Sequence, residues 1–268
     1  MGRPVVSPAA ETLDVRGGRF RIKLWSKGSG RPVLFLHGGG GVSEWPAWLD
    51  PFAERYRVIV PQHPGFGEST GLEHLDDFLD LTVYYLDFMD ELGLERPAVI
   101  GHSFGGAIAA EVAALGPERV GSLVLVGAIG LWIDEQPVGD IFAMTRSELE
   151  RSRWHDPEGA LAKGLIREPK DDAERRAQEL DSTQGLAATA KFVWPIPDKG
   201  LKKRIYRIKA PTLLVWGASD KLVPPTYGAL YQKLIPGSRL VVIPEAGHLP
   251  HWEQPMAFRD AVLEFLAP

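Results

Sequence analysis

Cysteine is absent from this chain of 268 residues. Its absence excludes disulfide bonds, thiolate nucleophiles and cysteine-ligated zinc or iron–sulfur centres. It leaves the redox compartment open, because a protein without cysteine tolerates oxidising and reducing surroundings alike. All chemistry that depends on a thiolate is therefore ruled out.

An excess of positive charge and long apolar runs are also missing. The formal net charge is −5 and there is no basic run, which argues against nucleic acid as a partner. No stretch approaches the roughly 20 apolar residues of a membrane span, and residues 1–15 lack the apolar core of an export signal. We expect a soluble, cytoplasmic monomer or homodimer that binds neither nucleic acid nor membrane.

Short apolar runs separated by helical patterns dominate both ends of the chain. Continuous apolar runs without alternation are typical of strands covered on both faces, as in a parallel sheet. They lie at residues 32–36, 56–60, 97–100, 122–126, 212–216 and 240–243, after two shorter strands at 12–15 and 20–25. Helical periodicity between them predicts an α/β fold with a mostly parallel central sheet and helices on both faces.

The alternation of strand and helix is interrupted in the middle of the chain. Residues 131–208 are helical and charged and contain three tryptophans. We interpret this segment as a helical cap inserted into a core domain formed by residues 1–130 and 209–268. Aromatic side chains above a site can form pocket walls, so the candidate substrate-binding residues are Trp132, Trp154 and Trp194.

The segment GHSFGG, residues 101–106, directly follows a strand-like run and opens an alanine-rich helix. Gly-x-Ser-x-Gly in this setting is typical of a nucleophile elbow, a turn too tight for a Cβ on either side of the serine. A glycine-rich turn that binds phosphate is the alternative, but the dinucleotide spacing and a P-loop lysine are both missing. Ser103 is therefore the candidate nucleophile.

A serine hydroxyl needs a base, and the base needs a group that orients it. His248 follows the apolar run at 240–243, and Asp220 follows the run at 212–216. Both should lie at the carboxyl edge of the sheet, where Ser103 also lies. We predict that His248 is the general base and that Asp220 orients its imidazole.

Four consecutive glycines follow His37 at the end of another apolar run. Glycine lets the backbone approach a substrate carbonyl closely, and N–H groups placed there stabilise an oxyanion. We assign the oxyanion hole to the N–H groups of Phe104 and Gly39. Gly40 is the less favoured donor and a candidate substrate contact.

Three other histidines are discounted as chemical groups. His102 adjoins the nucleophile, but its side chain should point away from Ser103 and pack. His63 and His251 have no carboxylate at ligand spacing, so we expect no metal site. We expect no cofactor either.

Taken together, these segments resemble the α/β-hydrolase superfamily over nearly the whole chain. The motifs that match in order are the glycine loop, PGFGES at 64–69, the elbow, WGASDKLVPP at 216–225 and GHLPHWEQP at 247–255. The resemblance implies the fold and a serine nucleophile, and it disfavours the members that use aspartate. Gln62 stands where relatives commonly carry aspartate, a change that we interpret as a local variation in hydrogen bonding.

The resemblance suggests a serine hydrolase that cleaves a small carboxylic ester or lactone through an acyl-enzyme. The alternative reaction is hydrolysis of a carbon–carbon bond in a vinylogous 1,5-diketone from ring fission. That substrate carries a carboxylate, for which the cap offers Arg146, Arg153, Lys191 and Lys202. A small-molecule receptor with little turnover is the alternative from another class, and an intact triad argues against it.

Overall fold

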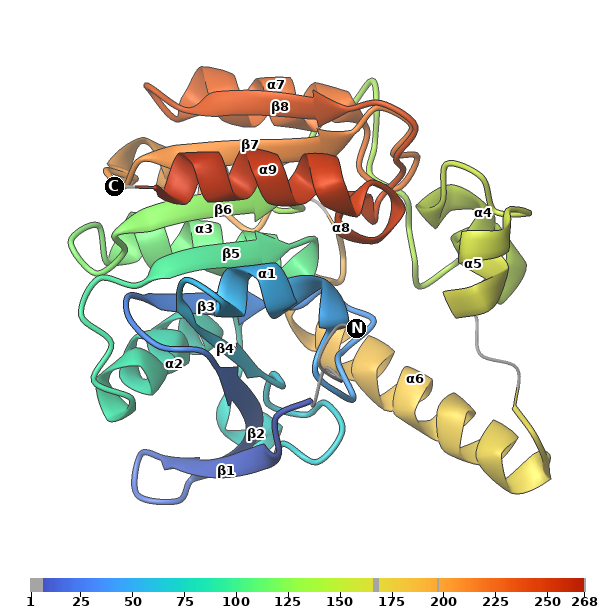
Figure 1. The fold of residues 1–268 in the computed structure, drawn as a ribbon, viewed down its shortest axis with the longest axis horizontal. Helices are drawn as coiled ribbons and strands as arrows, with labels where there is room; N and C mark the ends of the chain where they lie inside the picture. Colours follow the sequence, from blue (N-terminus) through green and yellow to red (C-terminus); the bar gives the residue numbers. More distant parts are fainter. Residues whose placement is uncertain (1–6, 166–168, 197, 268) are drawn as a thin grey trace.

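The computed structural model describes residues 7–165, 169–196 and 198–267. Its centre is an eight-stranded sheet with the order β1-β2-β4-β3-β5-β6-β7-β8 (Figure 1). The strands are β1 (Ala10–Val15), β2 (Phe20–Lys27), β3 (Pro32–Leu36), β4 (Arg57–Pro61), β5 (Ala98–His102), β6 (Ser122–Val126), β7 (Thr212–Gly217) and β8 (Arg239–Ile243). The pairs β1–β2 and β2–β4 are antiparallel, and the pairs from β4 to β8 are parallel. The predicted fold class is confirmed.

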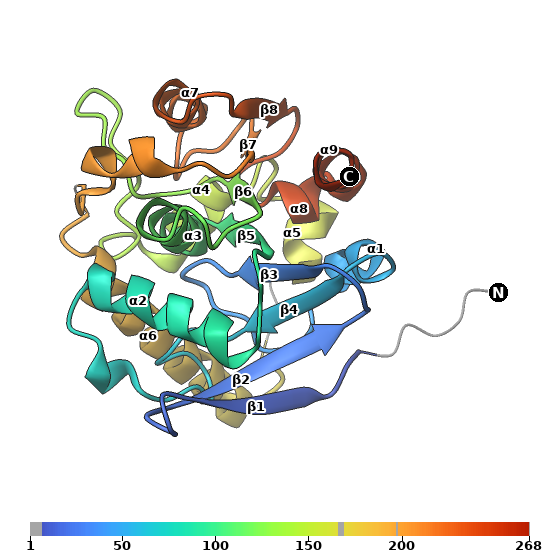
Figure 2. The same ribbon diagram turned by 90° about the vertical axis from the view of Figure 1, so that its left-hand side faces the viewer.

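Helices cover both faces of this sheet. They are α1 (Asp50–Ala53), α2 (Phe78–Glu91), α3 (Phe104–Leu115), α7 (Pro225–Leu234), the short α8 (Pro250–Glu253) and α9 (Pro255–Leu266). Leu34 and Leu36 of β3 belong to the core with α2, α3 and α7, whereas Val33 and Phe35 belong to the core with α1 and α9 (Figure 2). Because side chains alternate between two buried faces, the central strands show no polar alternation in sequence.

The described residues between β6 and β7 include three α-helices beyond the carboxyl ends of the central strands, followed by two short 3-10 helices at Leu201–Lys203 and Ile205–Arg207 (Figure 1). The α-helices are α4 (Arg146–Arg153), α5 (Ala160–Leu165) and α6 (Asp172–Val193). The buried residues of α6 all lie in its second half: Gly185, Ala188, Thr189, Phe192 and Val193. These helices belong to the segment that the sequence analysis assigns to a cap, whose limits at residues 131 and 208 stay a prediction.

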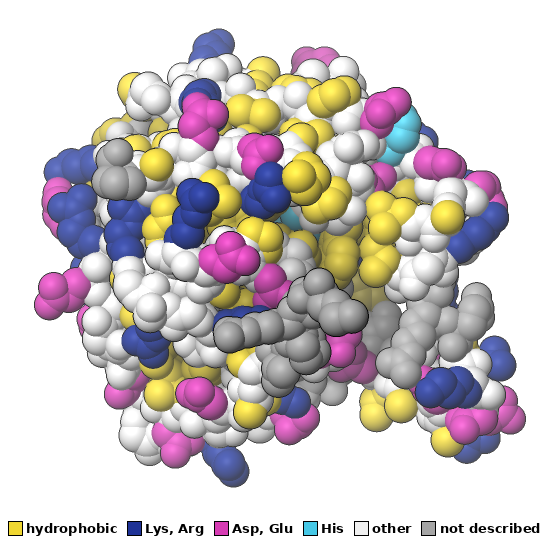
Figure 3. All heavy atoms as spheres, in the orientation of Figure 1, with side chains coloured by type: hydrophobic (Ala, Val, Ile, Leu, Met, Phe, Trp, Pro, Cys, Tyr) yellow, Lys and Arg dark blue, Asp and Glu magenta, His cyan; other side chains and the backbone are white. Residues whose placement is uncertain are grey.

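The surface carries charges of both signs. On the face in Figure 3, acidic and basic side chains are interspersed, as the small net charge of −5 suggests. Among the described residues, no helix combines the length and the hydrophobicity of a membrane span.

Gly105→Ala should destabilise the fold strongly. A Cβ at Gly105 of α3 would lie 2.1 Å from the Leu36 carbonyl oxygen, a backbone atom that cannot rotate away. We expect a loss of about 3 kcal/mol in the free energy of unfolding, measured with urea. Gly164→Ala in α5 is the control, because its Cβ meets nothing within 4 Å. Equal losses in the two variants would contradict this account.

Candidate active site

Ser103 lies between β5 and α3, in the middle of the carboxyl edge of the sheet. Its φ of 54° is in the left-handed region, a strained conformation for a residue with a Cβ. The turn is held because the Ser103 N–H donates to the Val126 carbonyl over 2.9 Å. The flanking residue Gly101 has no room for a Cβ, which would lie 2.3 Å from the Gly105 oxygen. The local structure is thus the tight turn that the motif predicts.

Asp220 and His248 are brought together in a buried pair. The Nδ1 of His248 lies 2.8 Å from Oδ2 of Asp220. The other carboxylate oxygen accepts the backbone N–H groups of Leu222 and Val223 at 3.0 and 2.9 Å. A proton on Nδ1 leaves Nε2 of His248 as the nitrogen that can accept a proton. Gly127, which the sequence analysis missed, lies behind the pair, and a Cβ there would be 3.2 Å from both partners.

His102 joins the serine loop to the histidine loop. It is 7% exposed, and its Nε2 donates to the carbonyl oxygen of His248 over 2.8 Å. Its ring lies 4.8 Å, centroid to centroid, from the rings of both His248 and His251. The expected packing role therefore includes a hydrogen bond that fixes the backbone of the predicted base.

The glycine loop passes directly over the nucleophile turn. A Cβ at Gly38 would lie 3.2 Å from Cβ of Ser103, so Gly38 makes the closest approach of the loop. A Cβ at Gly39 would lie 3.1 Å from Oγ1 of Thr189 in α6, whereas one at Gly40 would meet nothing within 4 Å. The N–H of Phe104 belongs to the first residue of α3. The assignment of oxyanion donors stays a prediction.

A pair of neutral histidines holds the start of this loop. His37 donates from Nδ1 to the Gly38 carbonyl over 2.7 Å and accepts the His63 N–H at Nε2 over 3.1 Å. His63 donates from Nε2 to the His37 carbonyl over 2.8 Å, and its Nδ1 bonds to the hydroxyl of Tyr85. Each ring uses one nitrogen as donor and one as acceptor, so both are neutral. Burial accordingly lowers the pKa of His37 to about 4.

The cap contacts the predicted base through its backbone. The His248 N–H donates to the Arg153 carbonyl over 2.7 Å. The carboxylate of Glu253 bridges the two segments, because it accepts the N–H of His155 on one oxygen and that of Gly247 on the other, each at 2.6 Å. The end of α4 is therefore fastened to the loop that carries His248.

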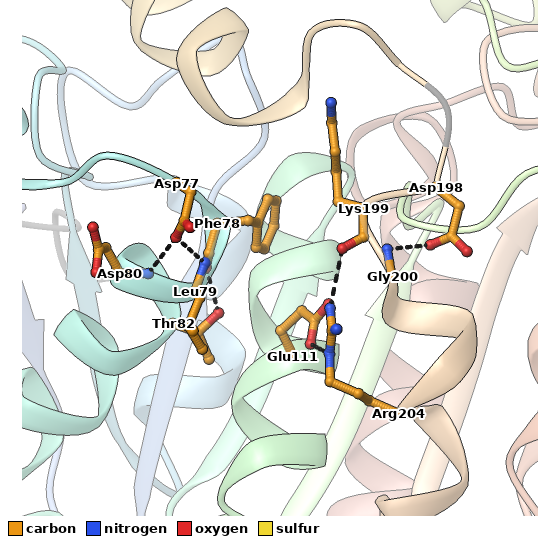
Figure 4. Close-up of polar contacts among 10 residues, drawn as sticks. All are labelled: Asp77, Phe78, Leu79, Asp80, Thr82, Glu111, Asp198, Lys199, Gly200 and Arg204. Atoms are coloured by element: carbon orange, nitrogen blue, oxygen red, sulfur yellow. Dashed lines mark hydrogen bonds and ion pairs between the residues drawn. The ribbon is translucent and has the colours of Figure 1, made fainter.

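A narrow apolar cavity of about 20 Å³ runs along α3 beneath the cap. Its walls are Phe78, Ala107, Glu111, Ile129, Gly130, Leu131, Val138, Val193, Ile196, Lys199 and Leu201. Figure 4 shows three of them, Phe78, Glu111 and Lys199. Two of its walls lie next to the backbone of Ser103, because the N–H groups of Ala107 and Ile129 both donate to the Ser103 carbonyl, but Ser103, Asp220 and His248 do not line it. This volume holds about one water molecule.

The three tryptophans of the predicted pocket are not among the residues that line this cavity. Trp154 is 3% exposed and packs with Ala162 and Leu249. Trp132 is partly buried against the main core, and Trp194 is 58% exposed. Their role in substrate binding stays a prediction.

Of the four cations considered for a substrate carboxylate, none lines the cavity. Arg146 and Lys202 are exposed, and Lys191 donates to the Leu72 carbonyl. Arg153 lies near the predicted base but pairs with Glu150 at 3.0 Å. The cation in the cavity wall is Lys199, which the sequence analysis did not single out although it lies in the loop WPIPDKG.

Gln62 has the local role that was expected for it. It is 4% exposed, and its Nε2 donates to the Val42 carbonyl over 2.7 Å. Its Oε1 accepts the Glu68 N–H over 3.1 Å. The amide thus joins the loop after β3 to the loop after β4, with a donor and an acceptor that one carboxylate could not supply together.

Comparison with known proteins shows the family to which this chain belongs. The sequence model of the alpha/beta hydrolase fold family matches residues 31–255. A 2-hydroxy-6-oxo-6-phenylhexa-2,4-dienoate hydrolase from Burkholderia cepacia is 31% identical over 96% of this chain and 95% of its own length. A 2-hydroxy-6-oxononadienedioate/2-hydroxy-6-oxononatrienedioate hydrolase from Comamonas testosteroni is 31% identical with the same coverage. The structure of a meta-cleavage product hydrolase from Pseudomonas fluorescens IP01 superposes with a TM-score of 0.77 at 24% identity, over 95% of this chain and 96% of that one.

Acid should destabilise the protein because it holds buried neutral histidines. Burial lowers the pKa of His37 to about 4, that of His251 to about 3, and those of His63 and His102 well below 6.5. In the unfolded chain each returns to about 6.5, so below that pH the unfolded state binds more protons. Stability should fall by about 1.4 kcal/mol per histidine for each pH unit between about 6 and 4.5. Urea unfolding across this range tests the slope, and a flat profile would contradict it.

Glu253→Gln should loosen the cap from the histidine loop. The amide can accept one of the two N–H groups but presents a donor to the other, which leaves a partly buried donor unpaired. We expect a loss of about 1–2 kcal/mol in the free energy of unfolding. Glu264→Gln is the control, since Glu264 forms only an exposed ion pair with Arg239 and should change stability by less than about 1 kcal/mol. Equal effects would show that Glu253 is not a bridge.

Proposed function

Because the chain belongs to the alpha/beta hydrolase fold family, we propose that it hydrolyses carbon–carbon bonds in 2-hydroxy-6-oxo-dienoates, with Ser103 as nucleophile. The observation that carries this proposal is the 31% identity, over 96% of the chain, to a hydrolase named for such a substrate. The buried Asp220–His248 pair and the strained serine, which follow strands at the same edge of the sheet, support it. The sequence analysis preferred an ester or lactone, and the relatives favour its alternative instead.

The chemistry uses the three predicted groups in order. The dienol first shifts its proton to C5, which gives a vinylogous 1,5-diketone. Ser103 Oγ then forms a bond to C6 while His248 Nε2 takes its proton, and the N–H groups of Phe104 and Gly39 hold the oxyanion. The C5–C6 bond breaks, its electron pair enters the dienolate, and His248 returns the proton to that fragment.

Water completes the reaction. His248 removes a proton from a water molecule, whose oxygen adds to C6 of the acyl-enzyme, and Ser103 leaves with the proton. The net change is the addition of one water across C5–C6, which yields a carboxylic acid and 2-hydroxypenta-2,4-dienoate. Asp220 keeps the imidazole in the tautomer that presents Nε2 to the serine.

Ser103→Ala should abolish this turnover. Removing the nucleophile of a triad typically costs at least about 10⁴-fold in kcat. The measurement is the loss of absorbance of a 6-phenyl dienoate at saturating concentration. The midpoint of thermal unfolding should equal or exceed that of wild type, because the change to alanine removes no buried hydrogen bond of the fold. Full turnover by the variant would refute the mechanism.

A substrate panel separates this function from its two rivals. It contains the 6-phenyl dienoate, short 4-nitrophenyl esters and homoserine lactones, each with wild type and Ser103→Ala. A higher kcat/KM on the esters or lactones than on the dienoate would restore the ester or lactone hypothesis. Negligible turnover with tight thermal stabilisation by one compound would indicate a receptor.

A further inference from the structure

The end of α4 lies against the loop that carries His248. The backbone N–H of His248 donates to the Arg153 carbonyl over 2.7 Å. A Cβ at Gly247 would lie 2.5 Å from that carbonyl oxygen and 2.8 Å from the backbone nitrogen of His155, so the approach requires glycine at this position. Residues 153–155 therefore pack directly on the backbone that leads into the predicted base.

Glu253 closes this contact from the side of the histidine loop. One of its carboxylate oxygens accepts the N–H of His155 and the other accepts the N–H of Gly247, each over 2.6 Å. Bonds to a charged acceptor are shorter and stronger than those between neutral groups. The partly buried carboxylate thus holds two backbone segments, which are distant in sequence, at a fixed separation.

The same segment also reaches the loop that carries Asp220. The Nδ1 of His155 lies 2.7 Å from the hydroxyl oxygen of Ser219, the residue that precedes Asp220. The N–H of Ser219 donates to the Ala246 carbonyl over 2.9 Å, so the loops of Asp220 and His248, the two triad loops, are also bonded to each other. His155 therefore joins one triad loop through its side chain and the other through its backbone.

These contacts determine where the backbone places the imidazole of His248. The bond from Nδ1 to Asp220 at 2.8 Å fixes one nitrogen of the ring. The direction of the other nitrogen, Nε2, depends in addition on the position of the backbone that carries the ring. A catalytic group that is misplaced by about 1 Å can cost about 10²-fold in rate. Contacts that hold this backbone should therefore affect turnover as well as stability.

We propose that His155 and Glu253 are positioning residues for the reaction: they hold residues 153–155 against the two triad loops and so direct Nε2 of His248 toward Ser103. Both act through the base and are not catalytic residues themselves. The inference rests on the proposed function, because it takes His248 as the general base. It gives the end of α4 a part in the chemistry.

The test compares His155→Ala, His155→Asn and Glu253→Gln with the control Glu150→Gln. The carboxylate of Glu150 accepts from the side chains of Arg153 and Trp154 at 3.0 and 2.8 Å and, among the described residues, from no group of either triad loop. The control therefore makes the same chemical change as Glu253→Gln and loosens the same helix end. Asparagine can place an amide atom near the position of Nδ1 and so keep the hydrogen bond that alanine loses.

Turnover of the 6-phenyl dienoate is the first measurement. His155→Ala and Glu253→Gln should each lower kcat by about 10-fold and change KM by less than about 2-fold, because a displaced base weakens the transition state and leaves substrate binding intact. His155→Asn should retain most of kcat. Glu150→Gln should stay within about 2-fold of wild type. Every rate is measured well below the midpoint of thermal unfolding of each variant, so that loss of folded protein does not contribute.

Phosphonylation of Ser103 tests the base without carbon–carbon cleavage. A small alkyl fluorophosphonate forms an ester with Oγ of Ser103 and releases fluoride, a step in which His248 takes the proton of the hydroxyl. The rate of inactivation should fall by the same factor as kcat in His155→Ala and Glu253→Gln. If wild type cleaves no dienoate, the proposed function fails, while this rate still decides the role of the two residues.

Four results would overturn the inference. Rates near those of wild type in His155→Ala and Glu253→Gln, or an effect confined to KM, would mean that the sheet alone positions the base. An equal loss of kcat in Glu150→Gln would reduce the effect to a general loosening of α4. A loss in His155→Asn as large as in His155→Ala would mean that the side-chain hydrogen bond is not what matters. A wild type that resists the fluorophosphonate would mean that Ser103 and His248 do not act as a pair.

Discussion

Close approach between backbone segments at the carboxyl edge of the sheet is the constraint on which the whole site depends. A Cβ at Gly101, Gly105 or Gly217 would lie 2.0–2.3 Å from a carbonyl oxygen of a neighbouring segment. These contacts bring the loops after β3, β5 and β7 and the loop that carries His248 within hydrogen-bonding reach. The predicted catalytic side chains are few. Their positions are set mainly by the packing of the backbone segments that carry them, and less by the hydrogen bonds that the side chains form. The strained φ of Ser103 persists because this packing determines it from several sides.

The predicted base is hydrogen-bonded through its backbone to both the predicted cap and the sheet. The N–H of His248 bonds to the carbonyl of Arg153, and the carbonyl of His248 bonds to His102 of β5. The base is therefore held between the cap and the sheet. The cavity along α3 is lined by other parts of the segment between β6 and β7, and Arg153 and His155 are not among its walls.

Much of this arrangement is predictable from sequence because local patterns encode it. The apolar runs identify the strands, and the elbow motif identifies Ser103. The edge rule for parallel sheets then places Asp220 and His248. Helix α3 begins at Phe104, directly after the predicted nucleophile, as the motif indicates. Gly127, Glu253 and Lys199 were missed because their roles arise from contacts between segments distant in sequence. The role of the tryptophans stays a prediction: Trp194 is 58% exposed, and no periodicity reveals which way a residue of this segment faces.

Helix α6 has a consequence for how this molecule can vary. Its 22 residues are buried only from Gly185 onward, and the earlier turns project from the body of the protein (Figure 1). Its second half contacts the glycine loop of the candidate active site, because Thr189 adjoins Gly39. One end of this helix is thus packed against the core, and the other is mostly exposed. Insertions, deletions or a grafted recognition sequence in its first turns would leave the core intact, which makes this projection the natural place for the protein to acquire a new partner without losing its old chemistry.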